Sequence, residues 1–221
     1  MDFRVNGAAC SIGISRLVIA GWTGRDRAAV EKHIAELEAI GVKRPRAVPV
    51  FYRAGAGLLT TAPEVEVVGG HSSGEVEFVL VSAPDALYVG VGSDHTDRKV
   101  ETYGVTVSKQ MCPKPVGADL WPFAEVEAHW DRLLLRSHLT RGGERVLYQE
   151  GAVSNMLPPR ELLARFSGSA SLAPGTAMFC GTLAVKGEIR GGERFEIELH
   201  DPVRKRSLAH GYWVRELELA D

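Results

Sequence analysis

The stretch GEVEFVLVSAPDALYVGVGSDHTDR, residues 74–98, combines two apolar runs with acidic side chains that the fold has to accommodate. Side chains two positions apart on a strand share a face, so Glu75 and Glu77 point the same way. This alternation by itself fits a solvated pair of glutamates. The residues that follow are apolar on both faces, however, which is typical of strands covered on both sides. Carboxylates in such surroundings are costly to bury unless a proton or a cation compensates them.

A third acid, Asp94, follows the second apolar run. An acid at the end of a strand can point back towards a neighbouring strand, and hence towards Glu75 and Glu77. Three carboxylates, with water completing the coordination shell, suit a hard divalent ion such as Mg²⁺ or Mn²⁺. No His/Cys pair lies nearby in the sequence, so zinc fits poorly. The segment therefore has two interpretations, a solvated acidic pair or most of a metal site.

The composition excludes several classes of function. A formal net charge of −2 gives no electrostatic reason to expect nucleic acid or an anionic membrane as a partner. The sequence has no 18-residue apolar stretch and no basic start followed by an apolar core, so we expect neither a transmembrane helix nor a signal peptide. Cys10, Cys112 and Cys180 are far apart and form no CxxC pair, which is typical of reduced structural thiols. We therefore expect a cytoplasmic protein.

Helical spacing is strongest in TGRDRAAVEKHIAELEAIGVKRP, residues 23–45, where Gly41 is the expected C-cap. Two further helical patches are FAEVEAHWDRLLLR (123–136) and PPRELLARFSG (158–168). Elsewhere short β-rich runs are separated by glycine and proline. Many short strands with few helices predict an α+β, mainly β fold.

Several motifs along the chain occur in a fixed order. They are GEVEF (74–78), DHTDR (94–98), SKQMCPKPVG (108–117), YQEGAVSNM (148–156) and SLAPGTAMFCGTL (171–183), preceded by His33 with Glu36 and by PVFYR (49–53). Each motif is weak alone, but together they are specific. Across residues 18–200 the chain resembles the fumarylacetoacetate hydrolase superfamily.

This resemblance implies a fold, a reaction class and an assembly. The fold would be a mixed β-roll with a few peripheral helices, in a single domain spanning residues 1–221. Residues 1–55 would supply N-terminal strands and a lid helix, and residues 56–221 the catalytic core. Members of the superfamily hydrolyse C–C bonds in acylpyruvates and related β-diketo or 2-oxo acids, or decarboxylate, hydrate or tautomerise related compounds. We accordingly expect a divalent-metal-dependent hydrolase acting on a small oxo acid, assembled as a homodimer.

The resemblance also assigns roles to individual residues. Glu75, Glu77 and Asp94 would be the metal ligands, with Mg²⁺ expected first and Mn²⁺ or Ca²⁺ as alternatives. The metal would polarise the substrate carbonyl as a Lewis acid. Lys109 would place a positive charge where enolate or oxyanion charge develops. Thr182 would donate a hydrogen bond to the substrate carboxylate.

The remaining candidate residues carry open alternatives. Arg98 and Gln149 would either contact the substrate or organise the groups around the metal, and Glu101 stands where relatives often have a substrate-contacting glutamine. His33 and Glu36 are three positions apart and so share one helix face. There Glu36 would orient the imidazole as a general base on water, as the hydrolases of the superfamily require. The alternative is two exposed polar residues, in which case the metal site favours decarboxylation or tautomerisation.

The pocket positions depart from the superfamily pattern more than the metal ligands do. Lys99 follows Arg98 where many members carry an acid, and Cys-Gly-Thr-Leu at 180–183 replaces Thr-Gly-Thr-Pro. The sequence therefore indicates a divergent branch whose substrate cannot be transferred from relatives. The rival hypothesis is a non-catalytic protein that binds a small acid in the same cavity. His71 and His95 lie near the acids in sequence, and we expect both to be structural or surface histidines.

Overall fold

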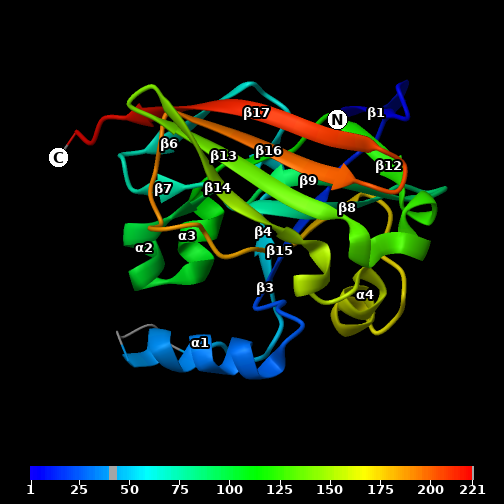
Figure 1. Cartoon of the computed structure of the whole chain (residues 1–221), viewed down its shortest axis with the longest axis horizontal. Coiled ribbons are helices and arrows are strands. Elements are labelled where there is room, and N and C mark those ends of the chain that lie inside the picture. The colour runs from blue at the N-terminus through cyan, green and yellow to red at the C-terminus, as the bar shows by residue number, and fades with distance from the viewer. Residues whose placement is uncertain (40–43, 221) are drawn as a thin grey trace.

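Two mixed β-sheets form the framework of the computed structural model, which describes residues 1–39 and 44–220 (Figure 1). The larger sheet has the strand order β2-β1-β12-β9-β8-β15-β3-β4. These strands are β1 (Asp2–Val5), β2 (Ala8–Ser11), β3 (Arg16–Gly21), β4 (Val50–Ala54), β8 (Val76–Ser82), β9 (Leu87–Ser93), β12 (Asp119–Pro122) and β15 (Thr176–Thr182). Strands from the N-terminal part of the chain therefore lie in the same sheet as β8, β9 and β15.

The second sheet covers one face of the first and has the order β14-β13-β16-β17-β6 (Figure 1). Its strands are β6 (Glu64–Val68), β13 (Leu134–Arg141), β14 (Glu144–Ala152), β16 (Arg194–Asp201) and β17 (Arg206–Leu217). Two short pairs complete the described strands, namely β7 (Ser72–Ser73) with β10 (Thr96–Asp97) and β5 (Leu59–Thr60) with β11 (Lys114–Pro115). The expected fold class, α+β and mainly β, is confirmed.

The helices lie at the periphery of the sheets (Figure 1). The α-helices of the described chain are α1 (Arg27–Ala39), α2 (Arg98–Tyr103), α3 (Val105–Met111) and α4 (Pro159–Ser167). Short 3₁₀ turns span Ala56–Leu58, Phe123–Glu125, Glu127–Arg132 and Val153–Asn155. Within the residues that the structure describes, no helix is long and apolar enough to cross a membrane.

The central strand β8 is covered on both faces, as its sequence predicts. Val76 and Phe78 belong to the apolar core between the two sheets. Val79 and Val81, on the opposite face, belong to a second core on the other side of the larger sheet. A carboxylate on this strand is therefore withdrawn from water, which makes the solvated interpretation of Glu77 wrong.

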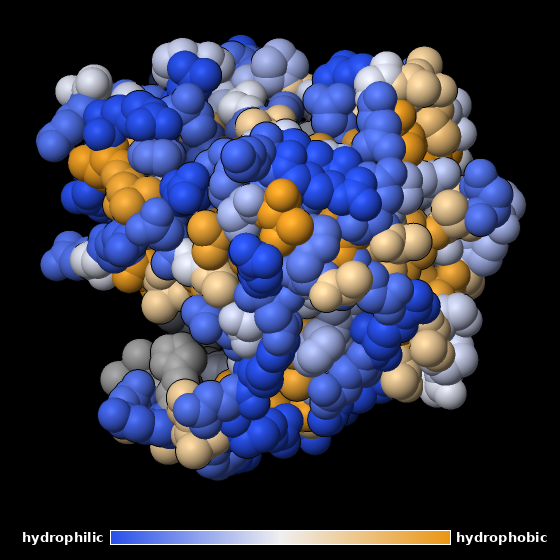
Figure 2. Space-filling view, turned by 45° about the vertical axis from the view of Figure 1, so that its right-hand side comes forward, coloured by the Kyte–Doolittle hydropathy of each residue, from blue (hydrophilic) through white to orange (hydrophobic). Residues whose placement is uncertain are grey.

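The first predicted helix is confirmed over the described residues. Asp26 caps α1 by accepting hydrogen bonds from the backbone amides of Ala28 and Ala29 at 2.9 and 3.1 Å. The expected cap at Gly41 lies outside the described residues. Figure 1 places α1 below α2 and α3, and Figure 2 shows the surface hollowed between the level of α1 and the body above it.

The helix predicted for residues 158–168 is confirmed as α4, which ends at Gly168 in the left-handed conformation (φ 73°). The helix predicted for residues 123–136 is present only as two 3₁₀ turns, Phe123–Glu125 and Glu127–Arg132, and it is wrong at its C-terminal end. Residues 134–141 form strand β13 between β14 and β16, with buried and half-buried positions alternating along the strand. Pairing on both sides outweighs the helix preference of the leucine-rich run that enters the strand.

Candidate metal centre

One β-hairpin brings Glu75 and Asp94 together. Strands β8 and β9 pair antiparallel with Val76 opposite Ser93, so Glu75 and Asp94 are the next pair outward. The backbone amide of Asp94 donates a hydrogen bond to the carbonyl oxygen of Glu75 at 2.9 Å. Glu77 lies two positions along β8 on the same face as Glu75, and one carboxylate oxygen from each acid lies within 4.8 Å of the others. We call Glu75, Glu77 and Asp94 the carboxylate cage.

The cage is largely removed from solvent. Asp94 is fully buried, Glu77 is 2% exposed and Glu75 is half-buried. Burial raises the pKa of Glu77 well above its ordinary value, and the neighbouring charges of Asp94 and Glu75 raise it further. Burial alone would also raise the pKa of Asp94, but the ammonium groups of Lys109 and Lys114 bring that pKa below its ordinary value.

Glu77 is held by a bulge in the neighbouring strand. The pairing of β15 with β8 shifts register between Phe179 and Thr182. Within this bulge the backbone amide of Gly181 donates a hydrogen bond to Oε2 of Glu77 at 2.7 Å. Gly181 has a φ of +103°, and a Cβ there would lie 1.7 Å from Oγ1 of Thr23, so only glycine fits. The glycine of the 180–183 motif therefore serves the cage directly.

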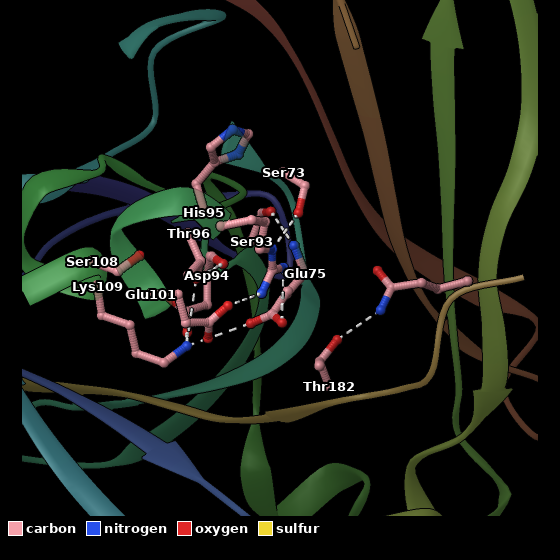
Figure 3. Close-up of polar contacts among 12 residues, drawn as sticks. Ser73, Glu75, Ser93, Asp94, His95, Thr96, Glu101, Ser108, Lys109 and Thr182 are labelled. Carbon is pink, nitrogen blue, oxygen red and sulfur yellow. Dashed lines mark hydrogen bonds and ion pairs between the residues drawn. The ribbon is translucent and has the colours of Figure 1, made fainter. Parts of the chain in front are cut away.

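Lys109, on α3, reaches the cage from the side (Figure 3). Its Nζ contacts Oδ2 of Asp94 and lies 3.5 Å from Oε2 of Glu75 and 3.4 Å from Oγ1 of Thr96. Burial would lower the pKa of Lys109, but the adjacent Asp94 and Glu75 carboxylates raise it above its ordinary value. The side chain is therefore a buried, charged ammonium beside the cage.

Arg98, the first residue of α2, links Glu75 to the surrounding structure. Its Nη2 lies 3.0 Å from Oε1 of Glu75 and its Nη1 3.0 Å from Oε2 of Glu101, while Nε donates to Oγ of Ser73 at 2.7 Å. Glu101 is thus drawn to the cage by the arginine (Figure 3). Arg98 also lines a cleft of about 500 Å³ on the molecular surface, together with Arg141.

Gln149 and Thr182 form a brace at the start of β8. The Oε1 atom of Gln149 accepts hydrogen bonds from the Val76 amide at 3.0 Å and from Oγ of Ser137 at 3.1 Å. Its Nε2 donates to Oγ1 of Thr182 at 2.8 Å and to the carbonyl oxygen of Leu183 at 2.6 Å. Oγ1 of Thr182 in turn donates to the Val76 carbonyl at 2.8 Å. All polar atoms of the Gln149 side chain are thus occupied by the protein, whereas Thr182 is half-buried.

Lys114 is a second buried lysine at the cage, and sequence reasoning missed it. It is 0% exposed, and its Nζ donates to the carbonyl oxygens of His95 at 2.6 Å and Cys112 at 3.0 Å. The same Nζ lies 3.3 Å from Oδ1 of Asp94. Burial lowers the pKa of Lys114, and Asp94 opposes that shift. The sequence carried little signal for this contact, because a lysine between two prolines is typical of an exposed loop.

His95 points away from the carboxylates despite its place next to Asp94 (Figure 3). The ring is fully buried, with Nε2 3.0 Å from Oγ of Ser72 and Nδ1 3.1 Å from the hydroxyl of Tyr212. Burial lowers the pKa of His95 to about 3, with Lys114 contributing to the shift. The expectation of a structural histidine is confirmed for His95.

The predicted pair on the first helix is described only in part. Residues 33 and 36 both lie in α1, and Glu36 is exposed, with an oxygen 3.8 Å from Nζ of Lys32. The side chain of His33 lies outside the described residues. The contact between His33 and Glu36 therefore stays a prediction.

The oxygen atoms of the cage fit a hard divalent cation. Carboxylates are the ligands that Mg²⁺ and Ca²⁺ prefer, and no histidine or cysteine joins the described cluster. Oδ1 of Asp94 is buried and has no hydrogen-bond partner among the described residues, although Lys114 lies within ion-pair distance. A buried carboxylate oxygen without a donor is available to coordinate a cation.

Comparison with known proteins defines the family and the fold. The model of the family described as "protein of unknown function (DUF2848)" matches residues 20–212. The chain belongs to the DUF2848 family. No curated protein matches its sequence.

Solved structures share the architecture of this DUF2848 member. A protein from Oleispira antarctica, described as a "putative fumarylacetoacetate isomerase/hydrolase", superposes with a TM-score of 0.70 at 17% identity, covering 97% of this chain and 100% of that one. A 2-keto-3-deoxy-D-arabinonate dehydratase complexed with magnesium and 2,5-dioxopentanoate gives a TM-score of 0.65 at 16% identity, covering 94% and 75%. The 4-oxalocrotonate decarboxylase from Pseudomonas putida G7, complexed with magnesium and adipate, gives 0.56 at 16% identity, covering 90% and 77%. The fold is that of the fumarylacetoacetate hydrolase superfamily.

Proposed function

We propose that the chain is a divalent-metal-dependent enzyme of oxo acids that hydrolyses a C–C bond in an acylpyruvate or a related β-diketo or 2-oxo acid. The observation that carries this proposal is the convergence of Glu75, Glu77 and Asp94 within 4.8 Å, with the Lys109 ammonium beside them. The shared fold with enzymes whose structures hold magnesium and small oxo or dicarboxylic acids supports the proposal.

The cage residues would hold the metal, with Mg²⁺ expected and Mn²⁺ or Ca²⁺ as alternatives. When bound, the cation supplies Lewis-acid polarisation of the substrate carbonyl. The remaining work falls to the chain. The Gly181 amide fixes Glu77 and the Arg98 guanidinium fixes Glu75, so two carboxylates are oriented before any ligand arrives.

Lys109 would stabilise the negative charge that develops on the substrate. Its ammonium is held in the charged form by Asp94 and Glu75, in a site with little water. A positive charge fixed in a poorly solvated site stabilises an enolate or oxyanion more strongly than it would in water. Thr182 would contact the substrate carboxylate by exchanging its hydrogen bond to the Val76 carbonyl for one to the substrate. Arg98 and Glu101 would border the substrate, because these side chains remain partly accessible at the edge of the cage. Gln149 would position Thr182 through their hydrogen bond and would not touch the substrate itself.

Hydrolysis also needs a general base that takes a proton from the attacking water. Glu36 would orient His33 on α1, and His33 would take the proton from water. In that role α1 would have to cover the cage as a lid. In this structure α1 lies below α2 and α3 (Figure 1). Without this pair the same site would serve a decarboxylase, hydratase or tautomerase, and the dehydratase and decarboxylase of the same fold favour that second candidate. We further propose that the protein acts as a homodimer in the cytoplasm.

A metal titration followed by a turnover screen tests the proposal. Isothermal titration calorimetry should detect Mg²⁺ or Mn²⁺ binding, and acylpyruvates, oxaloacetate and 2-oxo-3-enoic acids should then be screened for turnover. Lys109→Met should abolish turnover and lower the stability of the protein, because it removes one partner of the buried Lys109–Asp94 pair. Loss of hydrolysis in His33→Ala would support the base, whereas decarboxylation that survives it would favour the second candidate. Metal binding without turnover of any of these acids would favour a non-catalytic small-acid-binding protein.

A further inference from the structure

Lys114 is a buried cation for which the proposed reaction has no role. Its ammonium donates hydrogen bonds to the carbonyl oxygens of His95 and Cys112, and it forms an ion pair with Oδ1 of Asp94 at 3.3 Å. The first two contacts fix the ammonium independently of the cage, because they come from the backbone. The third contact is an electrostatic attraction that draws Oδ1 of Asp94 towards the ammonium.

Charges around the cage almost balance within the described chain. The cage and its neighbours contribute four carboxylates and three cations, namely Glu75, Glu77, Asp94 and Glu101 against Lys109, Lys114 and Arg98. Metal binding requires that the carboxylate ligands are ionised. With every group of the cluster ionised, its net charge is one negative charge. A divalent cation reverses that sign, and one carboxylate of an oxo acid restores neutrality.

We propose that Lys114 is a positioning residue that holds Oδ1 of Asp94 and weakens the cage for a free divalent cation, so that the cation and a 2-oxo acid anion bind together. This inference rests on the proposed function, since it concerns the same cage and substrate class. Nζ of Lys114 lies 3.3 Å from Oδ1 of Asp94 and both side chains are fully buried, so a cation bound by Asp94 is repelled by the ammonium. An anion next to the cation offsets that repulsion.

Calorimetric titration of Mn²⁺ into the purified full-length chain tests the inference. Lys114→Met removes the charge and keeps the length of the side chain, and we expect it to bind Mn²⁺ at least about tenfold more tightly than the wild type, since the repulsion between a buried ammonium and a nearby cation is weakly screened. Lys186→Met makes the same substitution at an exposed lysine whose Nζ lies 3.8 Å from Glu150, and it should leave Mn²⁺ binding unchanged. A purely structural role of Lys114 would lower thermal stability and leave the Mn²⁺ affinity of the folded protein unchanged, which would overturn the inference.

A second measurement uses the wild type and does not depend on a variant that folds. Saturating pyruvate, the simplest 2-oxo acid, should tighten Mn²⁺ binding at least about tenfold, because it supplies the missing negative charge. In Lys114→Gln, whose neutral amide still donates to a backbone carbonyl, this enhancement should shrink. Equal Mn²⁺ affinity of the wild type with and without pyruvate would overturn the inference and leave the proposed metal site standing. No Mn²⁺ binding in any variant, with or without pyruvate, would overturn the proposed function as well.

Discussion

The backbone amide of Asp94 donates a hydrogen bond to the carbonyl oxygen of Glu75 at 2.9 Å, so two of the three cage residues are cross-strand neighbours in one hairpin. The third, Glu77, is fixed by the Gly181 amide from the strand on the other side. The cage is therefore built on paired strands and not on loops. Changing a ligand side chain should alter metal binding while the surrounding sheet keeps its shape.

Glu77→Gln should abolish metal binding without loss of fold. The amide oxygen can still accept the hydrogen bond from Gly181, but the charge that a divalent cation needs is gone. We expect Mn²⁺ affinity to fall by about 100-fold or more, beyond the usual effect of changing a group that only supports a ligand. Calorimetry measures the affinity, and Glu150→Gln, on an exposed face, is the control. Unchanged Mn²⁺ binding in Glu77→Gln would show that the cage is not the site.

Metal should stabilise the wild-type fold. At a metal concentration a hundred times its Kd the free energy of unfolding should rise by about 2.7 kcal/mol, provided the metal does not bind the unfolded chain. For a chain of this size that corresponds to an increase in Tm of about 5–10 °C. Differential scanning calorimetry with Mn²⁺ and then with excess EDTA measures the shift, which should be absent in Glu77→Gln.

Asp94→Asn should destabilise the fold. The substitution leaves the buried ammonium groups of Lys109 and Lys114 without their shared carboxylate, and removing one partner of a buried pair costs about 3–5 kcal/mol. Asp131→Asn is the matched control, because Asp131 pairs with Arg25 at a side chain that is 58% exposed and should contribute less than about 1 kcal/mol. Urea unfolding measures both. Equal losses in the two variants would contradict the buried-pair interpretation.

Gln149→Leu should lower the free energy of unfolding by about 3 kcal/mol, because the Val76 amide and the Leu183 carbonyl lose their buried partner. The control is Gln110→Leu, where an exposed glutamine donates only to the Arg53 carbonyl at 2.7 Å. Urea unfolding again provides the measurement. If Gln149→Leu kept the free energy of unfolding of the wild type and raised KM, Gln149 would instead contact the substrate.

The free energy of unfolding should decrease as the pH is lowered below 6.5, because His95 binds a proton more readily in the unfolded chain than in the folded one. Its pKa is about 3 in the folded chain, below the ordinary value of 6.5, so between these values the unfolded chain binds the additional proton. The full contribution is present above pH 6.5 and is lost progressively as the pH falls towards 3. One such group costs about 1.4 kcal/mol per pH unit, or about 2 kcal/mol between pH 6.5 and 5.

The comparison of His95→Gln with His71→Gln isolates this effect. Unfolding by urea at pH 7, 6 and 5 should show a shallower loss of stability in His95→Gln than in the wild type. His71→Gln makes the same substitution at an exposed histidine and serves as the control. Parallel slopes in all three proteins would mean that His95 does not titrate on unfolding.

Local sequence patterns were enough to predict the strands of the cage and its acids. Alternation in residues 75–82 and apolar character on both faces predicted a doubly covered strand, and β8 packs against a core on each side. The order of the motifs predicted the superfamily fold. Local patterns suffice here because the period of a strand and the identity of its acids are both written in the sequence.

The groups that compensate the acids come from distant segments of the chain and could not be predicted from local patterns. Lys114 was missed because its partners, the carbonyl of His95 and the carboxylate of Asp94, lie 19 and 20 residues away and meet it only when β11 pairs with β5. The helix predicted for residues 123–136 was wrong at its end for a similar reason, since β13 is stabilised by two distant strands. Burial and pairing between distant segments depend on packing, and a local sequence pattern does not contain them.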